Sequence, residues 1–197
     1  MKNEIITVER NTKETNISLS LTLRGKGKAD VHTGIGFLDH MLEAFSKHGL
    51  FDLSLRCEGD LLVDSHHTIE DVGIVLGSAI KKAVGDKIAM KRYGHVILPM
   101  DDALILCAID LSGRPYLAFD VQFSTPTLGK LDTEMIREFF YAVSYGAEMN
   151  LHMKQFAGFN AHHIAEACFK AFAKALDMAT LTDSRIEGVW STKGSLS

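Results

Sequence analysis

Apolar and polar residues alternate near the start of the chain, and this pattern then gives way to a helical spacing. In "NISLSLTLRGKG" (16–27) alternate residues are apolar from Ile17 to Leu23, which predicts a half-buried strand. In "FLDHMLEAFSKHG" (37–49) the apolar residues recur every three or four positions up to Gly49. That spacing with a terminal glycine predicts a helix.

A second strand and a second helix are predicted next. "FDLSLRCEGD" (51–60) has the alternation and the flanking polar residues of a strand. Asp64 or Ser65 can cap a helix that we expect to extend from about His66 to Val84. The first half of the chain therefore has the order strand, helix, strand, helix.

The second half begins with apolar segments again. "HVILPMDDALILCAIDL" (95–111) and "YLAFDVQF" (116–123) are predicted to be strands joined by a hairpin at the turn "SGRP" (112–115). "DTEMIREFFYAVSYGAEM" (132–149) has the spacing of a helix. The strand and helix order of the first half thus begins again.

A short strand and a long helix complete this second series. "LHMKQFAG" (151–158) is predicted to be the strand. Asn160 can cap the helix, which we expect to continue through Asp177. The segment "VWSTKGSLS" (189–197) is polar and is expected to be mobile at its end.

Each half carries the motif His-His-x-x-Glu. It occurs in "HHTIE" (66–70) and again, 96 positions later, in "HHIAE" (162–166). Chance is the alternative explanation, but identical spacing at matched places makes it the weaker one. We predict one domain, 1–197, built of two pseudo-symmetric repeats (about 1–93 and 94–197). The expected fold class is α+β, with a mostly antiparallel sheet in each repeat and helices packed on one face of it.

Helical geometry separates the three side chains of the motif into two groups. At about 100° per residue, Glu70 lies about 40° from His66, whereas His67 lies about 100° from it. His66 and Glu70 can therefore share one ion, and His67 is left for another. If the two helices face each other, or face copies in neighbouring subunits, each ion takes a His-x-x-x-Glu pair from one helix and the second histidine of the other. The two sets are His66, Glu70 and His163, and His162, Glu166 and His67.

Imidazole and carboxylate ligands without thiolate suit manganese, iron, cobalt or zinc. Such a mixture is more typical of a catalytic site than of a structural one. For one copy of the motif alone, a polar helix face with partnered histidines is the slightly better interpretation. For both copies together, metal binding is the better interpretation.

The repeat suggests one further ligand in each half. His40 precedes the first motif, and alignment of "HMLEAF" with "EFFYAV" places Glu138 at the corresponding point of the second half. His40 would join His67, and Glu138 would join His66. A histidine partnered near a helix start is an equally good interpretation of His40. A solvated glutamate beside Arg137 is the better interpretation of Glu138 from the residues alone.

Composition narrows the functional classes. The chain of 197 residues is 46% hydrophobic and 23% charged, which is ordinary for a globular protein. A net charge of -4 and the lack of a basic aromatic stripe argue against nucleic-acid binding. Three scattered cysteines argue against a disulfide framework, and no apolar run is long enough to span a membrane. The N-terminus is too charged for a signal peptide, so we expect a cytoplasmic protein.

The motifs together resemble one family. "GFLDHM", "DSHHTIEDVG", "SGRP", "GFNAHHIAEACFKAF" and "STKG" are similar to those of the imidazoleglycerol-phosphate dehydratases, in the monofunctional form. The resemblance covers nearly the whole chain. It implies a repeated α+β unit, two Mn(II) ions per active site, and a 24-subunit shell built from trimers in which subunits share each site. The family's metal ligands fall on His40, His66, His67, Glu70, His162, His163 and Glu166, with an eighth position at Glu138, where many members have histidine.

The resemblance also implies a reaction and its machinery. D-erythro-imidazoleglycerol phosphate would lose water to give imidazole-acetol phosphate, a step of L-histidine biosynthesis, through an imidazolate stabilised by the two metals. Glu14 would carry a proton, although from the residues alone it is a surface glutamate at a strand start. The catalytic set would be Glu14, His40, His67, Glu70, His162 and Glu166. The substrate phosphate would be bound by Arg92, Arg114, Lys170, Ser191 and Lys193.

Each substrate-binding position also has a plainer interpretation. Arg92 and Arg114 could be solvated loop charges, and Lys170 could form a surface ion pair with Glu166 four residues earlier. Two other functions fit the metal motifs, namely a dinuclear metallohydrolase and a non-catalytic metal-binding or shell-forming protein. The basic residues argue against storage, which needs no anion site. A dehydratase would form a ketone, a hydrolase would release phosphate, and a storage protein would do neither.

Overall fold

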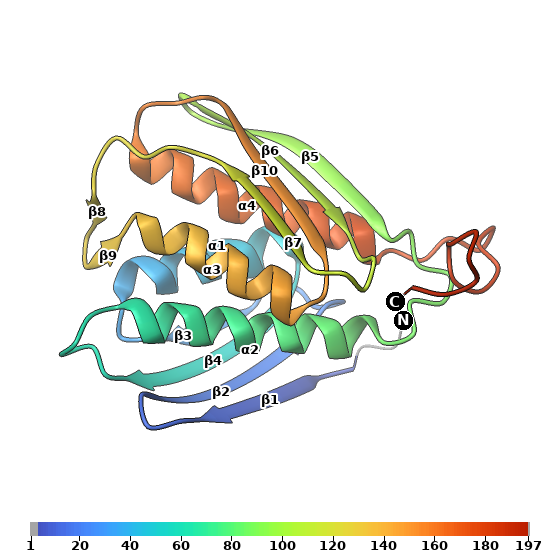
Figure 1. Ribbon diagram of the computed structural model, residues 1–197, viewed down its shortest axis with the longest axis horizontal. Coiled ribbons are helices and arrows are strands. Elements are labelled where there is room, and N and C mark those ends of the chain that lie inside the picture. Colours follow the sequence, from blue (N-terminus) through green and yellow to red (C-terminus); the bar gives the residue numbers. More distant parts are fainter. Residues whose placement is uncertain (1–3, 197) are drawn as a thin grey trace.

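The computed structural model describes residues 4–196, in which two four-stranded sheets enclose a layer of helices (Figure 1). The strands of the first sheet lie in the order β1-β2-β4-β3. Their bounds are Ile6–Asn11 (β1), Thr15–Thr22 (β2), Ala29–His32 (β3) and Asp52–Gly59 (β4). The pairs β1–β2 and β2–β4 are antiparallel, and β3–β4 is parallel.

The second sheet repeats this arrangement with the order β5-β6-β10-β7. Its strands are Tyr93–Met100 (β5), Ala103–Asp110 (β6), Tyr116–Asp120 (β7) and Asn150–Ala157 (β10). It also has two antiparallel pairs and one parallel pair. A small ribbon, β8 (Thr127–Leu128) with β9 (Leu131–Asp132), precedes the third helix. The sheets are therefore mostly antiparallel, as predicted.

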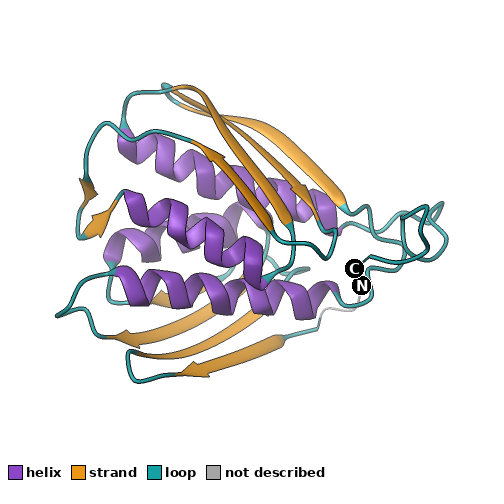
Figure 2. Ribbon diagram, in the orientation of Figure 1, coloured by secondary structure: helices purple, strands orange, loops and turns teal. Residues whose placement is uncertain are grey.

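The helices of the described residues lie between the sheets (Figure 2). They are α1 (Gly36–Gly49), α2 (His66–Val84), α3 (Glu134–Gly146) and α4 (Ala161–Thr180). Helix α2 packs on β1 and β2, and α4 packs on β5 and β6, so each sheet has its helices on one face. The α+β class and the two sheet-and-helix halves are confirmed. The division of the chain near residue 93 stays a prediction.

The helices also pair across the two halves. Helix α1 packs against α4, and α2 packs against α3. The second contact is close, because a Cβ at Gly77 would lie 2.6 Å from the carbonyl oxygen of Val143. Pairing across the halves brings a residue of one repeat next to the motif of the other, and this determines where the site forms.

The predicted hairpin at 112–115 is wrong. Strands β6 and β7 are not neighbours, because β10 lies between them and pairs antiparallel with β6 and parallel with β7. The apolar segment 95–111 itself contains the hairpin, with β5 and β6 joined at Asp101 and Asp102. Asp101 has a φ of 48°, the left-handed backbone of a tight turn. Local sequence favours pairing of successive strands, but β10 inserts between β6 and β7, where the backbone groups on both of its edges are paired.

The helix bounds, the cysteines and the hydropathy of the helices can each be compared with the predictions. Asn160 caps α4, which continues to Thr180 rather than Asp177, whereas α3 is shorter than predicted. Cys57, Cys107 and Cys168 are all buried and unpaired. Within residues 4–196, no helix combines the length and the hydropathy that crossing a membrane requires.

Candidate active site

Three of the predicted metal ligands meet where α1 packs against α4. His40, His162 and Glu166 each offer a ligand atom, and these atoms all lie within 4.8 Å of one another. The Asn160 side chain accepts hydrogen bonds from the backbone N–H groups of His162 (2.9 Å) and His163 (3.3 Å), so the motif begins at the first turn of α4. His162 and Glu166 are then one helical turn apart, with Nε2 and Oε2 separated by 3.4 Å.

Glu166 is the most buried member of this group. It is 9% exposed, and its Oε1 atom accepts a hydrogen bond from Lys170 Nζ at 2.6 Å. Burial acts to raise the pKa of Glu166, but the hydrogen bond and charge of Lys170, with smaller contributions from His40 and His162, lower it overall. Glu166 is therefore held as a carboxylate, which is the form that binds a metal ion.

The first motif is organised around His67. Its Nδ1 atom lies 3.0 Å from Asp60 Oδ2, and its Nε2 atom lies 3.7 Å from Glu14 Oε1. The hydrogen bond to Asp60, aided by the charge of Glu14, raises the pKa of His67. His66 is exposed and Glu70 is half-buried at the start of the same helix. Glu14, the predicted proton carrier, thus lies beside a predicted ligand.

His163 has a matching environment in the second half. Its Nδ1 atom lies 2.6 Å from Asp102 Oδ1, and its Nε2 atom lies 3.5 Å from Asp101 Oδ2. Asp102 also accepts backbone hydrogen bonds from Phe159 (2.7 Å) and Asn160 (3.0 Å). The Asn160 and Phe159 N–H groups and then His163 hold the pKa of Asp102 well below its usual range.

Glu138 lies beside Arg137, as expected for a helix-surface glutamate. Its Oε1 atom accepts a hydrogen bond from Arg137 at 2.7 Å. Among residues 4–196, only His40, His162 and Glu166 form a group of three ligands at close range, so His66, Glu70 and Glu138 do not converge within one chain. The role of Glu138 as an eighth ligand stays a prediction.

Four of the five predicted phosphate-binding residues line one cavity of about 370 Å³. They are Arg92, Arg114, Ser191 and Lys193. Arg92 is held in a defined orientation by Asp110, with Nε–Oδ1 and Nη2–Oδ2 distances of 2.6 and 2.9 Å. Ser191 Oγ accepts the backbone N–H of Lys193 at 3.2 Å, which fixes the turn of the "STKG" segment. Lys170, the fifth residue, lies instead beside Glu166.

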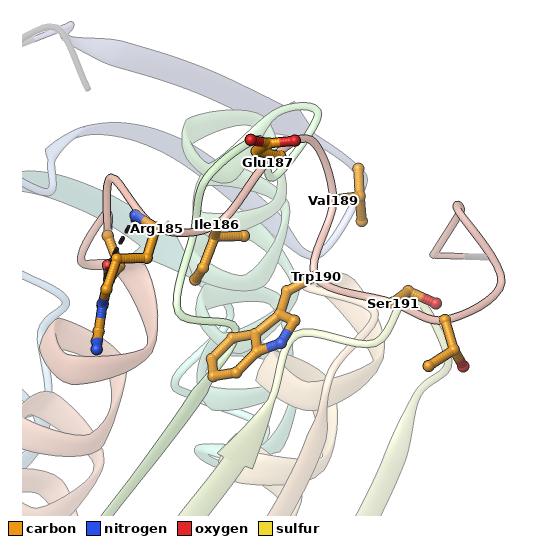
Figure 3. Close-up of a pocket in the computed structure, with 8 residues that line it drawn as sticks. Arg185, Ile186, Glu187, Val189, Trp190 and Ser191 are labelled. Carbon is orange, nitrogen blue, oxygen red and sulfur yellow. Dashed lines mark hydrogen bonds and ion pairs between the residues drawn. The ribbon is translucent and has the colours of Figure 1, made fainter.

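Trp190 lines both this cavity and a second one. Its carbonyl oxygen accepts a hydrogen bond from Arg92 Nη1 at 3.0 Å, and its ring packs edge-on against Tyr93. The second cavity, of about 510 Å³, is lined by residues of the segment 183–192. Figure 3 shows Trp190 inside the curve of this segment. Apart from Ser191, this second cavity contains none of the predicted site residues.

The metal-ligand cluster and the cationic cavity lie at opposite ends of α4. His162 is in the first turn of this helix, and Leu181 is its C-cap, so the two are about 28 Å apart. The Leu181 carbonyl accepts the backbone N–H of Lys91 at 2.7 Å, which fixes the neighbouring Arg92 at that end. In Figure 1 the C-terminal segment likewise extends beyond the far end of α4. The two groups of one chain therefore cannot contact the same small molecule.

Asp60 and Asp102 are site residues that no sequence pattern indicated. Asp60 is seven residues before its histidine, outside the motif, and Asp102 is 61 residues before His163. Neither spacing has a local periodicity that would connect the two residues. Only strand pairing brings the β5–β6 turn next to the first turn of α4.

A mixed α+β fold with a histidine and glutamate cluster at one end and a cationic cavity at the other is typical of a metal-dependent enzyme that acts on a phosphorylated compound. The sequence model of the family described as imidazoleglycerol-phosphate dehydratase matches residues 33–176. The chain belongs to this family.

Similar proteins match over almost their full length. The imidazoleglycerol-phosphate dehydratase of Lachnoclostridium phytofermentans is 60% identical over 194 residues, which are 98% of this chain and 99% of the relative. That of Acetivibrio thermocellus is 57% identical over 96% of this chain and 97% of the relative.

Two solved structures share the fold. The crystal structure of imidazoleglycerol-phosphate dehydratase from Staphylococcus aureus has a TM-score of 0.83 and 37% identity, covering 91% of this chain and all of that one. The structure of the Pyrococcus furiosus protein in complex with (S)-C348 has the same TM-score and identity, covering 96% of this chain and all of that one.

Proposed function

We propose that the chain is a hydro-lyase that removes water from imidazoleglycerol phosphate to give imidazole-acetol phosphate, a step of histidine biosynthesis. Membership of the family over nearly the whole chain supports this reaction. The convergence of His40, His162 and Glu166 within 4.8 Å is the single structural observation that carries it. The competing hydrolase would need the same cluster but a different product.

Mn(II), with two ions per active site, is the proposed cofactor. Imidazole nitrogen and carboxylate oxygen are suitable donors, and donor atoms bound to one ion at about 2.1 Å lie within about 4.2 Å of one another. The observed cluster therefore needs only a small inward movement to bind an ion. When bound, the ions would supply positive charge that stabilises an anionic imidazole ring and orients it.

Protein side chains would transfer the proton and bind the phosphate. Glu14 lies 3.7 Å from the Nε2 atom of His67 and is 53% exposed, so a proton can move between its carboxylate and the substrate side of the site. Arg92 uses three of its five N–H donors on Asp110 and Trp190. This arrangement leaves a fixed guanidinium edge beside Arg114 and Lys193 for the phosphate.

We further propose that subunits share each site in a 24-subunit assembly built from trimers. His162 at the start of α4 is separated from Arg92 near the other end of this helix, and this supports sharing, because the phosphate and the imidazole ring of one substrate are only a few bonds apart. The cationic cavity of one subunit would lie over the metal-ligand cluster of another. Lys170, beside Glu166, would then reach the phosphate from the metal side.

The proposed location is the cytoplasm. The three buried, unpaired cysteines support it, because thiols persist in a reducing compartment. A small phosphorylated substrate is the proposed partner. The net charge of -4 argues against a nucleic acid as a further partner.

The test is to deplete the purified protein of metal with a chelator, restore Mn(II), and measure ketone formation and bound metal in the same sample. We expect ketone that depends on Mn(II), with two ions per chain. Release of inorganic phosphate in place of ketone would favour the hydrolase, and bound metal without any turnover would favour storage.

A further inference from the structure

In each motif an aspartate holds the second histidine through its Nδ1 atom. His67 Nδ1 lies 3.0 Å from Asp60 Oδ2, and His163 Nδ1 lies 2.6 Å from Asp102 Oδ1. All four side chains are only partly exposed, between 20% and 34%. The same contact is thus made twice, once for each motif.

A carboxylate at Nδ1 determines which ring nitrogen carries the proton. An ionised carboxylate only accepts hydrogen bonds, so Nδ1 must be the donor, and in the neutral imidazole, the form that binds a metal ion, Nε2 retains its lone pair. In both halves Nε2 points toward another carboxylate, that of Glu14 at 3.7 Å and that of Asp101 at 3.5 Å. The lone pair therefore faces the anionic side of the site, where a cation would be bound.

The two aspartates do not occupy equivalent positions of the repeat. Asp60 directly follows β4, and the residue that directly follows β10, the counterpart of β4, is Gly158. Asp102 lies in the β5–β6 turn, and the β1–β2 turn that corresponds to it places Glu14, not an aspartate at Nδ1, near His67. Simple inheritance from a duplicated unit does not explain two contacts made from different elements.

We propose that Asp60 and Asp102 are positioning residues that fix the orientation and tautomer of His67 and His163, so that each Nε2 atom presents its lone pair to a metal ion. The inference rests on the metal site proposed above. Histidines that bind metals commonly donate their other N–H to a carboxylate, and loss of such a partner lowers metal affinity by about 10- to 100-fold.

The surroundings of Asp102 make one substitution especially informative. Its Oδ2 atom accepts backbone N–H groups from Phe159 (2.7 Å) and Asn160 (3.0 Å). In an Asp102→Asn variant, the amide oxygen must take this place, so the amide NH₂ faces His163 Nδ1. That nitrogen then becomes the acceptor, the proton moves to Nε2, and the lone pair for the metal is lost.

The experiment measures Mn(II) binding in chelator-buffered solutions for the unaltered protein, Asp102→Asn and a control. Asp52→Asn is the matched control, because Asp52 Oδ1 also accepts two backbone N–H groups, from Lys26 (2.8 Å) and Lys28 (3.0 Å), but lies at the start of β4. We expect Asp102→Asn to lower the Mn(II) affinity by about 10- to 100-fold, and Asp52→Asn to leave it unchanged. Excess Mn(II) should restore the activity of Asp102→Asn, which a folding defect would not allow.

An Asp102→Asn variant that binds Mn(II) as tightly as the unaltered protein would overturn the inference. If this variant fails to fold, Asp60→Ala carries the test, because the Asp60 side chain makes no backbone hydrogen bond among those observed in the described residues. A loss of about 10-fold in Mn(II) affinity supports the inference, and unchanged affinity overturns it. An unaltered protein that binds no Mn(II) would overturn the proposed metal site as well, whereas two ions bound with equal affinity by all variants would overturn only the inference.

Discussion

Lys170 Nζ lies 2.6 Å from Glu166 Oε1, one helical turn further along α4. Both side chains are largely buried, at 15% and 12% exposed, so this pair differs from a solvated surface ion pair. Lys170 Nζ also donates to the Met100 sulfur at 3.4 Å, which holds the ammonium group beside β5. The ammonium group is therefore fixed beside the proposed metal cluster rather than free to move on the surface.

The Lys170→Ala variant is expected to bind substrate more weakly. A charged hydrogen bond to phosphate contributes about 1.5–3 kcal/mol, so KM should rise by about 10-fold or more. Steady-state kinetics with imidazoleglycerol phosphate measures the effect. Lys174→Ala, an exposed lysine one turn further along the same helix, is the control. Unaltered KM and kcat in Lys170→Ala would remove this residue from the phosphate site.

His67→Ala is expected to lose activity together with one of two bound ions per chain. The reason is that Nε2 of this histidine is a proposed ligand and its Nδ1 atom is already held by Asp60 at 3.0 Å. Metal analysis of the purified variant beside a turnover assay gives both quantities. His32→Ala, which removes a histidine with a 67% exposed side chain on β3, should change neither. Full metal content with full activity in His67→Ala would refute the ligand assignment.

Two inactive variants are expected to complement each other if subunits share the site. His162→Ala damages the metal end of α4, and Arg114→Ala damages the cationic cavity at the other end. When the two chains are mixed randomly in one assembly, about one quarter of the sites combine two intact contributions. Activity of co-expressed chains, compared with each variant alone, measures this. A complete lack of complementation in a mixed assembly would place the whole site within one chain.

Gly77→Ala is expected to destabilise the fold. A Cβ at this position of α2 would lie 2.6 Å from the carbonyl oxygen of Val143 and 2.9 Å from the amide nitrogen of Ala147. Such overpacking costs about 1–3 kcal/mol, which urea unfolding can measure. Gly36→Ala is the matched control on α1, because a Cβ there meets no atom within 4 Å. Equal stability of the two variants would mean that α2 and α3 are less closely packed.

Acid is expected to weaken the loop between β2 and β3. The backbone N–H groups of Lys26 and Lys28 lower the pKa of Asp52, outweighing the smaller effect of burial. A group whose pKa is lowered by folding stabilises the protein above its ordinary pKa of 3.8, and this contribution is lost as the pH falls through the folded value. Unfolding measured from pH 6 down to about pH 3 should therefore show a smaller acid dependence for Asp52→Asn than for the unaltered protein. An identical slope would exclude Asp52 as a source of acid sensitivity.

Local sequence predicted part of the site, but it did not predict which residues meet within one chain. The Asn160 cap places His162 and Glu166 on one face of α4, as the motif and its spacing predicted. Of the two residues expected to share an ion with them, His40 joins them within one chain, whereas His67 does not. The predicted hairpin at 112–115 was wrong, because the strand between β6 and β7 comes from much later in the chain.

The sequence by itself determined the helices, most of the strands, the duplicated motif and the family. These features depend on spacings of two to four residues, which backbone geometry converts directly into faces of strands and helices. Only the tertiary structure decided that α1 packs against α4 and that β10 lies between β6 and β7. It also decided that Asp102 reaches His163 and that the metal-ligand cluster and the cationic cavity lie at opposite ends of α4. These contacts join residues far apart in the chain, and they form because the buried faces of whole elements must be covered, a requirement to which no short segment is sensitive.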